Sequence, residues 1–464
     1  MDLLQTYKDS CNSDGEDHRT FDQSSPDSSP PRLSIVPKSA APKVDGTMLS
    51  FTVAAAITNK TLFSAGWRLL HDLTPEQTTV SMIVSKDFLE ENGTSMRGNK
   101  SKKMKLINAH LKKINKPFLK SIKSSDGDII DCVLFHLQPA FDLSELRGKM
   151  SLIPPELPKE HANAGKNPEI KQLWNSKGES CPNGTIPIKR TRASDIFRSI
   201  SISKFGKKYS RKDIPVSTQH EHAVGCVTQR EFYGAKALLN VWRPNVTGND
   251  FSLSQIWVIA DVPNRPVNTI EVGWQVYPSL HKDSLPRLFT YWTADGYQSG
   301  CYNLVCPGFV QTNPNVCLGA AIDPTSKYGG QQYEGAYMIW KDPKSADWWL
   351  RVGTEVIGFW PSNLFTDLRD HATIIEYGGE VYAENLGTHT STQMGSGHFQ
   401  NEGFRKAAYA RKLEVVDHDN HLIGVSNLGV IAEKPNCYGV KNGYNNAWGN
   451  YIYFGGPGYN PNCL

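Results

Sequence analysis

The chain has 464 residues, of which 39% are hydrophobic, and its 50 basic and 46 acidic residues leave a formal net charge of +4. This near balance argues against a nucleic-acid partner, which would require a basic surface. No apolar run approaches the roughly 18–20 residues that a membrane-spanning helix needs, so we expect neither nucleic acid nor membrane as a partner.

The first 58 residues form a tract rich in Ser, Pro and Asp, which cannot bury enough apolar surface to fold. We expect a disordered tail there, followed by an unassigned linker at 59–103. The tract, with SSPDSSPPRL at 24–33, resembles the N-terminal tail of plant pre-mRNA-processing factor 17, a WD-repeat splicing protein. No repeats of WD length follow. We therefore interpret residues 1–58 as a fusion, which would explain why the N-terminus shows no signal peptide.

Helical and strand patterns begin after this tail. A helix is predicted over 103–115, with an apolar stripe made of Met104, Ile107, Leu111 and Ile114. Within 121–137, a turn at Asp126-Gly127-Asp128 precedes a strand. Residues 143–170 read as a linker and 191–203 as a second short helix. The basic stretch that follows, 204–212, is predicted to be an exposed and cleavable boundary.

After residue 215, helical periodicity disappears and aromatic residues become frequent. Short strands separated by Gly, Asn and Pro indicate a β-sandwich or barrel. The strand candidates are 221–229, 252–260, 268–277, 287–293, 334–341, 347–359, 372–382, 411–417 and 422–431.

Two of these strands carry acidic residues that could form a catalytic pair. Strand alternation places Glu271 beside Gly273 on one face, and Glu380 follows Gly378-Gly379 in the second strand. Two carboxylates that oppose each other cannot both ionise easily, so one keeps its proton and the pair supplies an acid and a base. From spacing alone, an ordinary solvent-facing role for each glutamate is the more common outcome.

Long motifs between residues 104 and 464 resemble the plant neprosin family. They include INKPFLKSIKSSDGDIIDCV at 114–133, LWNSKGESCPNGTIPIKRT at 173–191, IEVGWQV at 270–276, YGGEVY at 377–382 and YIYFGGPGYNPNC at 451–463. The resemblance implies an all-β peptidase domain of two packed antiparallel β-sheets, a β-sandwich, at 215–464. It also implies a small α+β activation domain at 104–205.

The same resemblance implies an activity. The family's characterised activity is that of a glutamic endopeptidase, made as a zymogen, which works in acid and cleaves on the carboxyl side of proline. Glu271 and Glu380 occupy the positions of its catalytic glutamates, whereas Glu376 falls outside the match and is interpreted as structural. Which glutamate is the base stays open. We expect proline-containing peptides or proteins as substrates, no metal or organic cofactor, and an extracellular location.

Side chains near these strands are candidates to bind the substrate, and the aromatic ones could line an apolar pocket for a proline ring. They are Trp274, Gln275, Tyr291, Trp292 and Tyr297. Packing in the core is the competing use for the aromatic residues.

Nine cysteines and the absence of a CxxC motif favour an oxidising compartment over a zinc ribbon. Placement suggests three disulfides, and the resemblance implies the same pairs: Cys301–Cys306, Cys437–Cys463 and Cys132–Cys181. Cys226 and Cys317 have no expected partners elsewhere, and are either free or paired with each other.

Metal-binding interpretations of two further motifs agree less well with the sequence. His220 and His222 share a strand face but lack a third ligand, so a hydrogen-bonded pair is favoured over a metal site. Residues 417–421 resemble a calcium loop but lack its Gly and distal Glu, and are predicted to form a hairpin turn. The alternative function is a non-enzymatic, cell-wall-associated binding module whose aromatic residues form a glycan platform.

Overall fold

A computed structural model describes most of the chain beyond residue 101. The described residues are 11, 102–146, 154–160, 170–198, 202, 205–208, 220–228, 230–384 and 389–463. The predicted tail at 1–58 (except Cys11), nearly all of the predicted linker at 59–103 and the end of the predicted boundary, 209–212, lie outside them. Within the described residues, no helix is both long enough and apolar enough to span a membrane.

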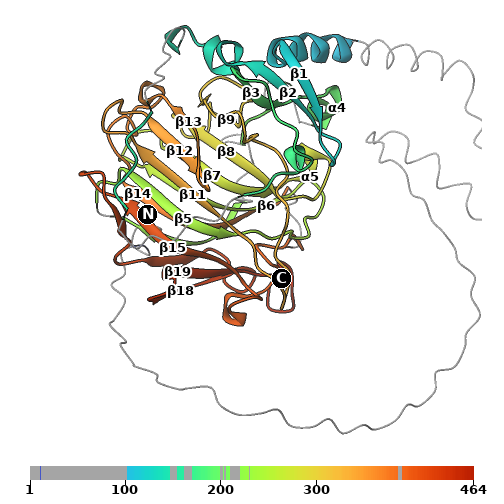
Figure 1. The fold of residues 1–464 in the computed structure, drawn as a ribbon. Coiled ribbons are helices and arrows are strands. Elements are labelled where there is room, and N and C mark those ends of the chain that lie inside the picture. The colour runs from blue at the N-terminus through green and yellow to red at the C-terminus, as the bar shows by residue number, and fades with distance from the viewer. Residues whose placement is uncertain are drawn as a thin grey trace, which may run out of the picture. The chain divides into compact units, whose positions relative to one another are not determined.

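The first described part combines helices with a small antiparallel sheet (Figure 1). A helix covers 102–114, and its predicted stripe buries Ile107 against Ile196 and Phe205. The sheet has the order β1-β2-β3. The elements are β1 (Phe118–Lys123), β2 (Ile129–Leu134), β3 (Thr185–Lys189), α4 (Ala193–Arg198), and the 3-10 helices η1 (Phe135–Leu137), η2 (Pro139–Asp142), η3 (Ser144–Leu146) and η4 (Leu173–Asn175).

Seven strands form a second antiparallel sheet in the order β17-β4-β14-β6-β7-β8-β9. Their bounds are β4 (His220–Val227), β6 (Phe251–Ala260), β7 (Asn268–Val276), β8 (Arg287–Thr293), β9 (Cys301–Tyr302), β14 (Ile374–Tyr382) and β17 (Gly429–Ala432). The one-turn helix α5 (Pro278–His281) joins β7 to β8. Because β6 lies between β7 and β14, the two strands predicted to carry catalytic glutamates flank a common neighbour.

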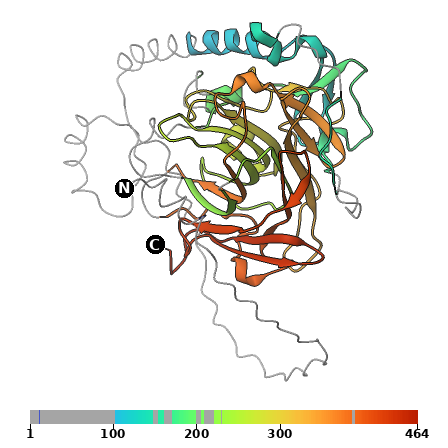
Figure 2. The same cartoon turned by 90° about the vertical axis from the view of Figure 1, so that its left-hand side faces the viewer.

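A third sheet has nine strands in the order β10-β13-β12-β11-β5-β15-β19-β18, with β16 also paired to β15. Its strands are β5 (Gly234–Asn240), β10 (Val310–Gln311), β11 (Glu334–Lys341), β12 (Trp348–Val352), β13 (Glu355–Trp360), β15 (Ala408–Val416), β16 (Leu422–Gly424), β18 (Gly439–Asn445) and β19 (Gly449–Gly455). The 3-10 helices η7 (Ser362–Leu364) and η8 (Gln400–Glu402) lie in its connections. In both views, β18 and β19 lie at the opposite end of these sheets from β1–β3 (Figure 1, Figure 2).

The main core lies between the seven- and nine-stranded sheets, which confirms the predicted β-sandwich. Side chains from both sheets meet there in one hydrophobic cluster, among them Trp274, Tyr377, Tyr337, Trp348 and Trp360. Every one of these five side chains is fully buried. The hydrophobic effect therefore fixes which face of each strand points inward, and the opposite face of the seven-stranded sheet is left to form a site.

Most predicted strands are present, with local differences. The predicted strand 347–359 is a hairpin, because the chain turns at Gly353 between β12 and β13. The predicted strand 422–431 is two strands, β16 and β17, which belong to different sheets. The hairpin turn predicted at 417–421 is confirmed, since the Asn420 amide donates to the Asp417 carbonyl.

The disulfides confirm three predictions and correct one. Cys132–Cys181, Cys301–Cys306 and Cys437–Cys463 form as expected. A fourth bond joins Cys226 to Cys11, so the prediction that Cys226 is free or paired with Cys317 is wrong. No spacing rule links cysteines that lie 215 residues apart, so this bond could not be predicted from placement. Four disulfides are consistent with an extracellular protein.

We predict that the unreduced, denatured protein contains one titratable thiol per chain, that of Cys317. In the native protein this thiol should resist alkylation, because it is buried and burial raises its pKa. Thiol titration with and without denaturant, followed by peptide mapping, measures both quantities. Three thiols after denaturation would show that the Cys11–Cys226 bond is not formed.

Candidate functional site

The two predicted glutamates lie on the same face of the seven-stranded sheet. Glu271 is on β7 and Glu380 on β14, and their side chains point away from the core that the neighbouring residues of each strand fill. The two residues are 0% and 2% exposed. Burial of two carboxyl groups is costly unless each is paired, so their surroundings decide what they can do.

Two glycines flank the one side chain of β6 that lies between these carboxylates on the sheet surface. In the pairing register, Gln255 of β6 stands opposite both Gly273 of β7 and Gly378 of β14. A Cβ atom at Gly273 would lie 2.0 Å from the Ser254 carbonyl oxygen, so no larger residue fits. The register position that lies between the two glutamates, across β7, β6 and β14, therefore carries one side chain, that of Gln255.

Neutral donors surround Glu271. The Gln255 amide donates to Oε2 at 3.0 Å, and the hydroxyls of Thr269 and Tyr297 donate to Oε1 at 3.0 and 3.1 Å. Tyr297 has left-handed backbone geometry, with φ of 66°, in the turn after β8. That turn brings its hydroxyl back to the sheet.

Glu380 has a different kind of partner. Nδ1 of His220, the first residue of β4, lies 2.5 Å from its Oε1 atom. The His220 ring packs against Tyr382 with ring centroids 4.8 Å apart. His222, also on β4, pairs instead with Glu433 at 3.1 Å, and although burial opposes the charge, this pair raises the pKa of His222 to about 9. The two histidines therefore pair with different carboxylates.

A lysine bridges the two glutamates. Nζ of Lys208 lies 2.5 Å from Oε2 of Glu271 and 3.3 Å from Oε2 of Glu380. The lysine is 7% exposed, and its ammonium also lies 5.6 Å from the centre of the Tyr291 ring. A cation held by two carboxylates therefore occupies the space between them.

The segment that carries Lys208 is anchored to the sheet by its backbone. The Tyr302 amide donates to the Gly206 carbonyl at 2.9 Å, and the Lys208 amide donates to the Tyr291 hydroxyl at 3.2 Å. Phe205 is buried in the cluster of the first helix. The prediction that the stretch from 204 is exposed is therefore wrong at Phe205 and Lys208. The basic composition predicted solvation, whereas the lysine is paired inside the protein.

Electrostatics make this arrangement mutually stabilising. Burial by itself would lower the pKa of Lys208, but the two carboxylates outweigh it and raise that pKa above its ordinary value. Burial would likewise raise the pKa of Glu380, yet Lys208 and His220 hold it well below its ordinary value. Lys208 is therefore charged, and Glu380 is ionised beside it.

The predicted substrate-binding residues divide between the two faces of the sheet. Gln275, Tyr291 and Tyr297 lie on the face of the glutamates, where Tyr291 is directly opposite Glu271 in register. Trp274 faces the core and donates to the Asn240 carbonyl. Trp292 follows Tyr291 in the strand and also packs on the core side, so both tryptophans were wrongly predicted.

Glu376, interpreted from the sequence as structural, is buried on the same face of β14, opposite Cys226. Other residues around the glutamates were missed. Sequence reasoning did not identify Lys208, His220 or Gln255 as neighbours of the glutamates. His220 and Gln255 carried a weak signal, since each lies on a strand that pairs with β14.

A second buried ion cluster joins the small sheet to the sandwich. The side chain of Arg287, the first residue of β8, is 0% exposed and contacts three carboxylates. Its Nη1 lies 2.6 Å from Asp128 and its Nη2 lies 3.2 Å from Asp126, both in the β1–β2 turn, while Nη2 is 2.5 Å from Asp283. Burial opposes the charge of Asp126, but its hydrogen bonds and Arg287 lower its pKa.

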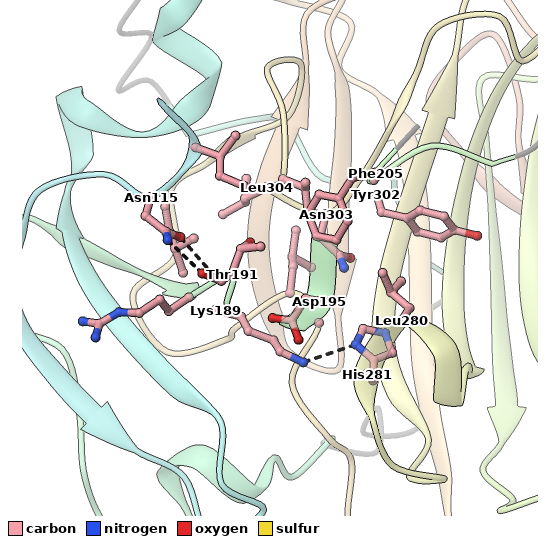
Figure 3. A pocket seen from close by; sticks show the side chains of 17 residues that line it. Asn115, Lys189, Thr191, Asp195, Phe205, Leu280, His281, Tyr302, Asn303 and Leu304 are labelled. Atoms are coloured by element: carbon pink, nitrogen blue, oxygen red, sulfur yellow. Dashed lines mark hydrogen bonds between the residues drawn. The ribbon is translucent and has the colours of Figure 1, made fainter. Parts of the chain in front are cut away.

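A small cavity lies beside this cluster (Figure 3). Its volume is about 60 Å³, far below the ~300–1,000 Å³ of typical ligand pockets. On its wall, Nζ of Lys189 lies 3.2 Å from Nδ1 of His281 (Figure 3). Burial and the nearby Lys189 lower the pKa of His281 well below its ordinary value. The cavity is thus part of the contact between the two parts of the chain and not a substrate site.

Two family models match successive parts of the chain. The family model described as Neprosin matches residues 248–457, which contain both glutamates. The model described as Neprosin activation peptide matches residues 121–226, which contain Lys208 and His220.

Solved structures of glutamic peptidases are also similar to part of the chain. One is a Scytalido-glutamic peptidase with a peptide-based transition state analog, and another is SCP-B, a member of the Eqolisin family, with the tripeptide Ala-Ile-His. Each is 8% identical, covers 51% of this chain and 98% of its own, and has a TM-score of 0.26. At this TM-score, the similarity supports no comparison of individual residues.

The Arg287 cluster generates a prediction about docking of the small sheet. Replacing Asp126 and Asp128 together by Asn should weaken its attachment by about 3 kcal/mol, because Arg287 loses two buried charge partners. Hydrogen exchange of β1–β3 as a function of pH measures this attachment. Protection of these strands should be lost at a higher pH than in the unaltered protein.

The matched control is Asp142→Asn, which removes an acidic partner of Lys116 within the small part itself. That pair is partly exposed and should matter little. Equal pH profiles for the double variant and the control would contradict a role of the Arg287 cluster in docking.

Proposed function

Because the chain belongs to the neprosin family of peptidases and carries that family's activation peptide, we propose that it is the zymogen of a glutamic endopeptidase activated by acid. The observation that carries this proposal is Lys208, the activation-peptide residue that holds Glu271 and Glu380 together. The proposal assigns 104–205 to the activation domain and 215–464 to the mature peptidase.

The two glutamates supply the chemistry of hydrolysis. Once Lys208 has left, two buried carboxyl groups face each other, and one of them keeps a proton because two adjacent negative charges repel. The ionised group then activates water, and the protonated group polarises the scissile carbonyl. This mechanism uses only the two side chains and water.

Acid sensitivity follows from the depressed pKa of Glu380. A carboxylate with a lowered pKa in the folded state stabilises that state above its ordinary pKa, near 4.5, and this contribution is lost as the pH falls below that value. Lys208 stays charged throughout this range, since its pKa is raised. Acidification therefore removes the attraction for Lys208 without neutralising the lysine, and the segment is released.

Release of this segment would expose the chain for cleavage. We place the cleavage at 209–214, between Lys208 and the start of β4, and the four disulfides support an extracellular setting for it. Substrates would then reach a face lined by Tyr291, Tyr297 and Tyr302, where the centre of the Tyr291 ring lies 6.0 Å from that of Tyr297 and 4.9 Å from that of Tyr302. Flat aromatic walls of this kind suit the ring of a proline residue, which supports cleavage after proline.

We predict that Glu271→Gln and Glu380→Gln each abolish cleavage of a proline-rich peptide in acid. Either change leaves one carboxyl group, so acid and base are no longer both present, and losses of at least 10²-fold are expected in kcat. Peptide cleavage followed by mass spectrometry measures the rate and the bond cut. Glu376→Gln, on the same face of β14, should retain activity and serves as the matched control. Full activity of both variants would refute the dyad, and sugar binding without cleavage would favour the binding-module alternative.

We also predict that Lys208→Ala shifts activation to higher pH. Without the ammonium, the activation segment loses both buried ion pairs, so less protonation is needed to release it. The pH at which half of the precursor is converted, followed by intact mass, measures the effect. Lys207→Ala is the matched control, because the neighbouring lysine does not contact the glutamates. Identical midpoints for the two variants would show that Lys208 does not hold the latent state.

A further inference from the structure

The two glutamates differ in the charge of their permanent partners. With Lys208 removed, Glu271 keeps three neutral donors, those of Gln255, Thr269 and Tyr297. Glu380 keeps His220, a group that is a cation in acid. This difference bears on a question that the proposed function leaves open, namely which glutamate carries the proton.

His220 is positioned to stay on Glu380 during catalysis. It belongs to β4, which pairs with β14 along its length, and its ring packs against those of Tyr382 and Phe251. The side chain of His220 is 23% exposed, whereas that of Glu380 is 3% exposed. An imidazolium 2.5 Å from a buried carboxylate favours the ionised form of that carboxylate.

Glu271, in contrast, is surrounded by groups that can accept a hydrogen bond from its protonated form. Oε1 of Gln255 is buried and has no hydrogen-bond partner within the described part of the chain. Rotation of the Gln255 amide by half a turn would exchange its nitrogen and oxygen, so that this oxygen accepts from a protonated Glu271. The Tyr297 and Thr269 hydroxyls can also change from donor to acceptor.

We propose that Glu380 is the ionised base and Glu271 the protonated acid of the active enzyme, and that His220 is the positioning residue that fixes these roles. This inference rests on the proposed function and specifies it further. The charged and titratable groups that face Glu380 are His220 and His222 of β4, Glu271 of β7, Lys208 in the precursor, and the hydroxyls of Tyr297 and Tyr302. His222 is already paired with Glu433, which leaves His220 as the cation in contact.

The resulting reaction is balanced. Glu380 takes a proton from water as the water oxygen bonds to the scissile carbonyl carbon, and Glu271 gives its proton to the carbonyl oxygen. In the second step the C–N bond breaks, the leaving nitrogen takes the proton from Glu380, and one hydroxyl of the intermediate returns a proton to Glu271. The products are a carboxylic acid and an amine, and both glutamates regain their starting states.

The test is the pH dependence of kcat for His220→Gln, measured on protein already converted to the mature form. Without the cation, Glu380 should hold its proton up to higher pH, so the acidic limb of the profile should move up by about one unit or more. KM for the peptide should change much less, since His220 acts through Glu380. His222→Gln is the matched control on the same strand face and should shift the limb by far less.

A lysine at this position provides a second, independent variant. His220→Lys retains a positive charge and should keep the acidic limb near that of the unaltered enzyme. An unshifted limb in His220→Gln, or an equal shift in His220→Lys and His220→Gln, would overturn the assignment. Failure of the His220 assignment can be told apart from failure of the proposed peptidase function. If only the assignment of base and acid is wrong, Glu271→Gln and Glu380→Gln still abolish cleavage.

Discussion

Two buried carboxylates on one sheet face need a positive charge or a proton, and the structure supplies Lys208. Isolated ions in a protein interior are strongly unfavourable, and a buried pair persists only with close partners. The rest of the site follows from this constraint. The Gln255 amide and the hydroxyls of Thr269 and Tyr297 satisfy the remaining acceptor positions of Glu271. The latent state is therefore stabilised by the same groups that would perform catalysis.

The activation region contacts the sandwich at several places, and some of these contacts depend on ionised carboxylates. The Lys208 bridge and the Arg287 cluster are two of them, and the pairs of Glu160 with Lys236 and Arg351 are a third. Acid therefore weakens several contacts at once. Breaking a buried ion pair is far more costly than breaking an exposed one, so the more buried of these contacts contribute most to the pH dependence of docking.

Much of the fold was predictable from pattern, because burial imposes it. The helix stripe around Ile107 and the alternation around Glu271 identified the inward faces, and family motifs selected Glu380 over Glu376. Strand β5, with its Ala-rich sequence GAKALLN, and the Gly- and Asn-rich strands β18 and β19 were missed. Their strand state comes from pairing with neighbours, which local propensity does not encode.

The site was less predictable than the fold, for a related reason. Trp274 and Trp292 have the chemistry expected of a proline pocket, but one-residue alternation sends both to the core side. Lys208 has the chemistry of a solvated surface residue, and only the course of the chain past Tyr302 carries it into the site. Composition describes what a side chain prefers on average, whereas long-range pairing decides where it lies.

Charge balance connects the latent and the active states. In the precursor, Lys208 and His220 both contact the pair of carboxylates. When Lys208 leaves, one positive charge is lost, and in the proposed mechanism a proton on Glu271 replaces it. That proton is also the one the reaction needs, since it is delivered to the carbonyl oxygen. In the proposed mechanism, acid thus replaces the charge of a lysine by a proton, and the exchange that frees the site also places the dyad in its working protonation state. A precursor that released Lys208 without taking up this proton would present two ionised carboxylates and no general acid. Release of the activation segment and the catalytic protonation state of the dyad therefore depend on the same protonation equilibrium.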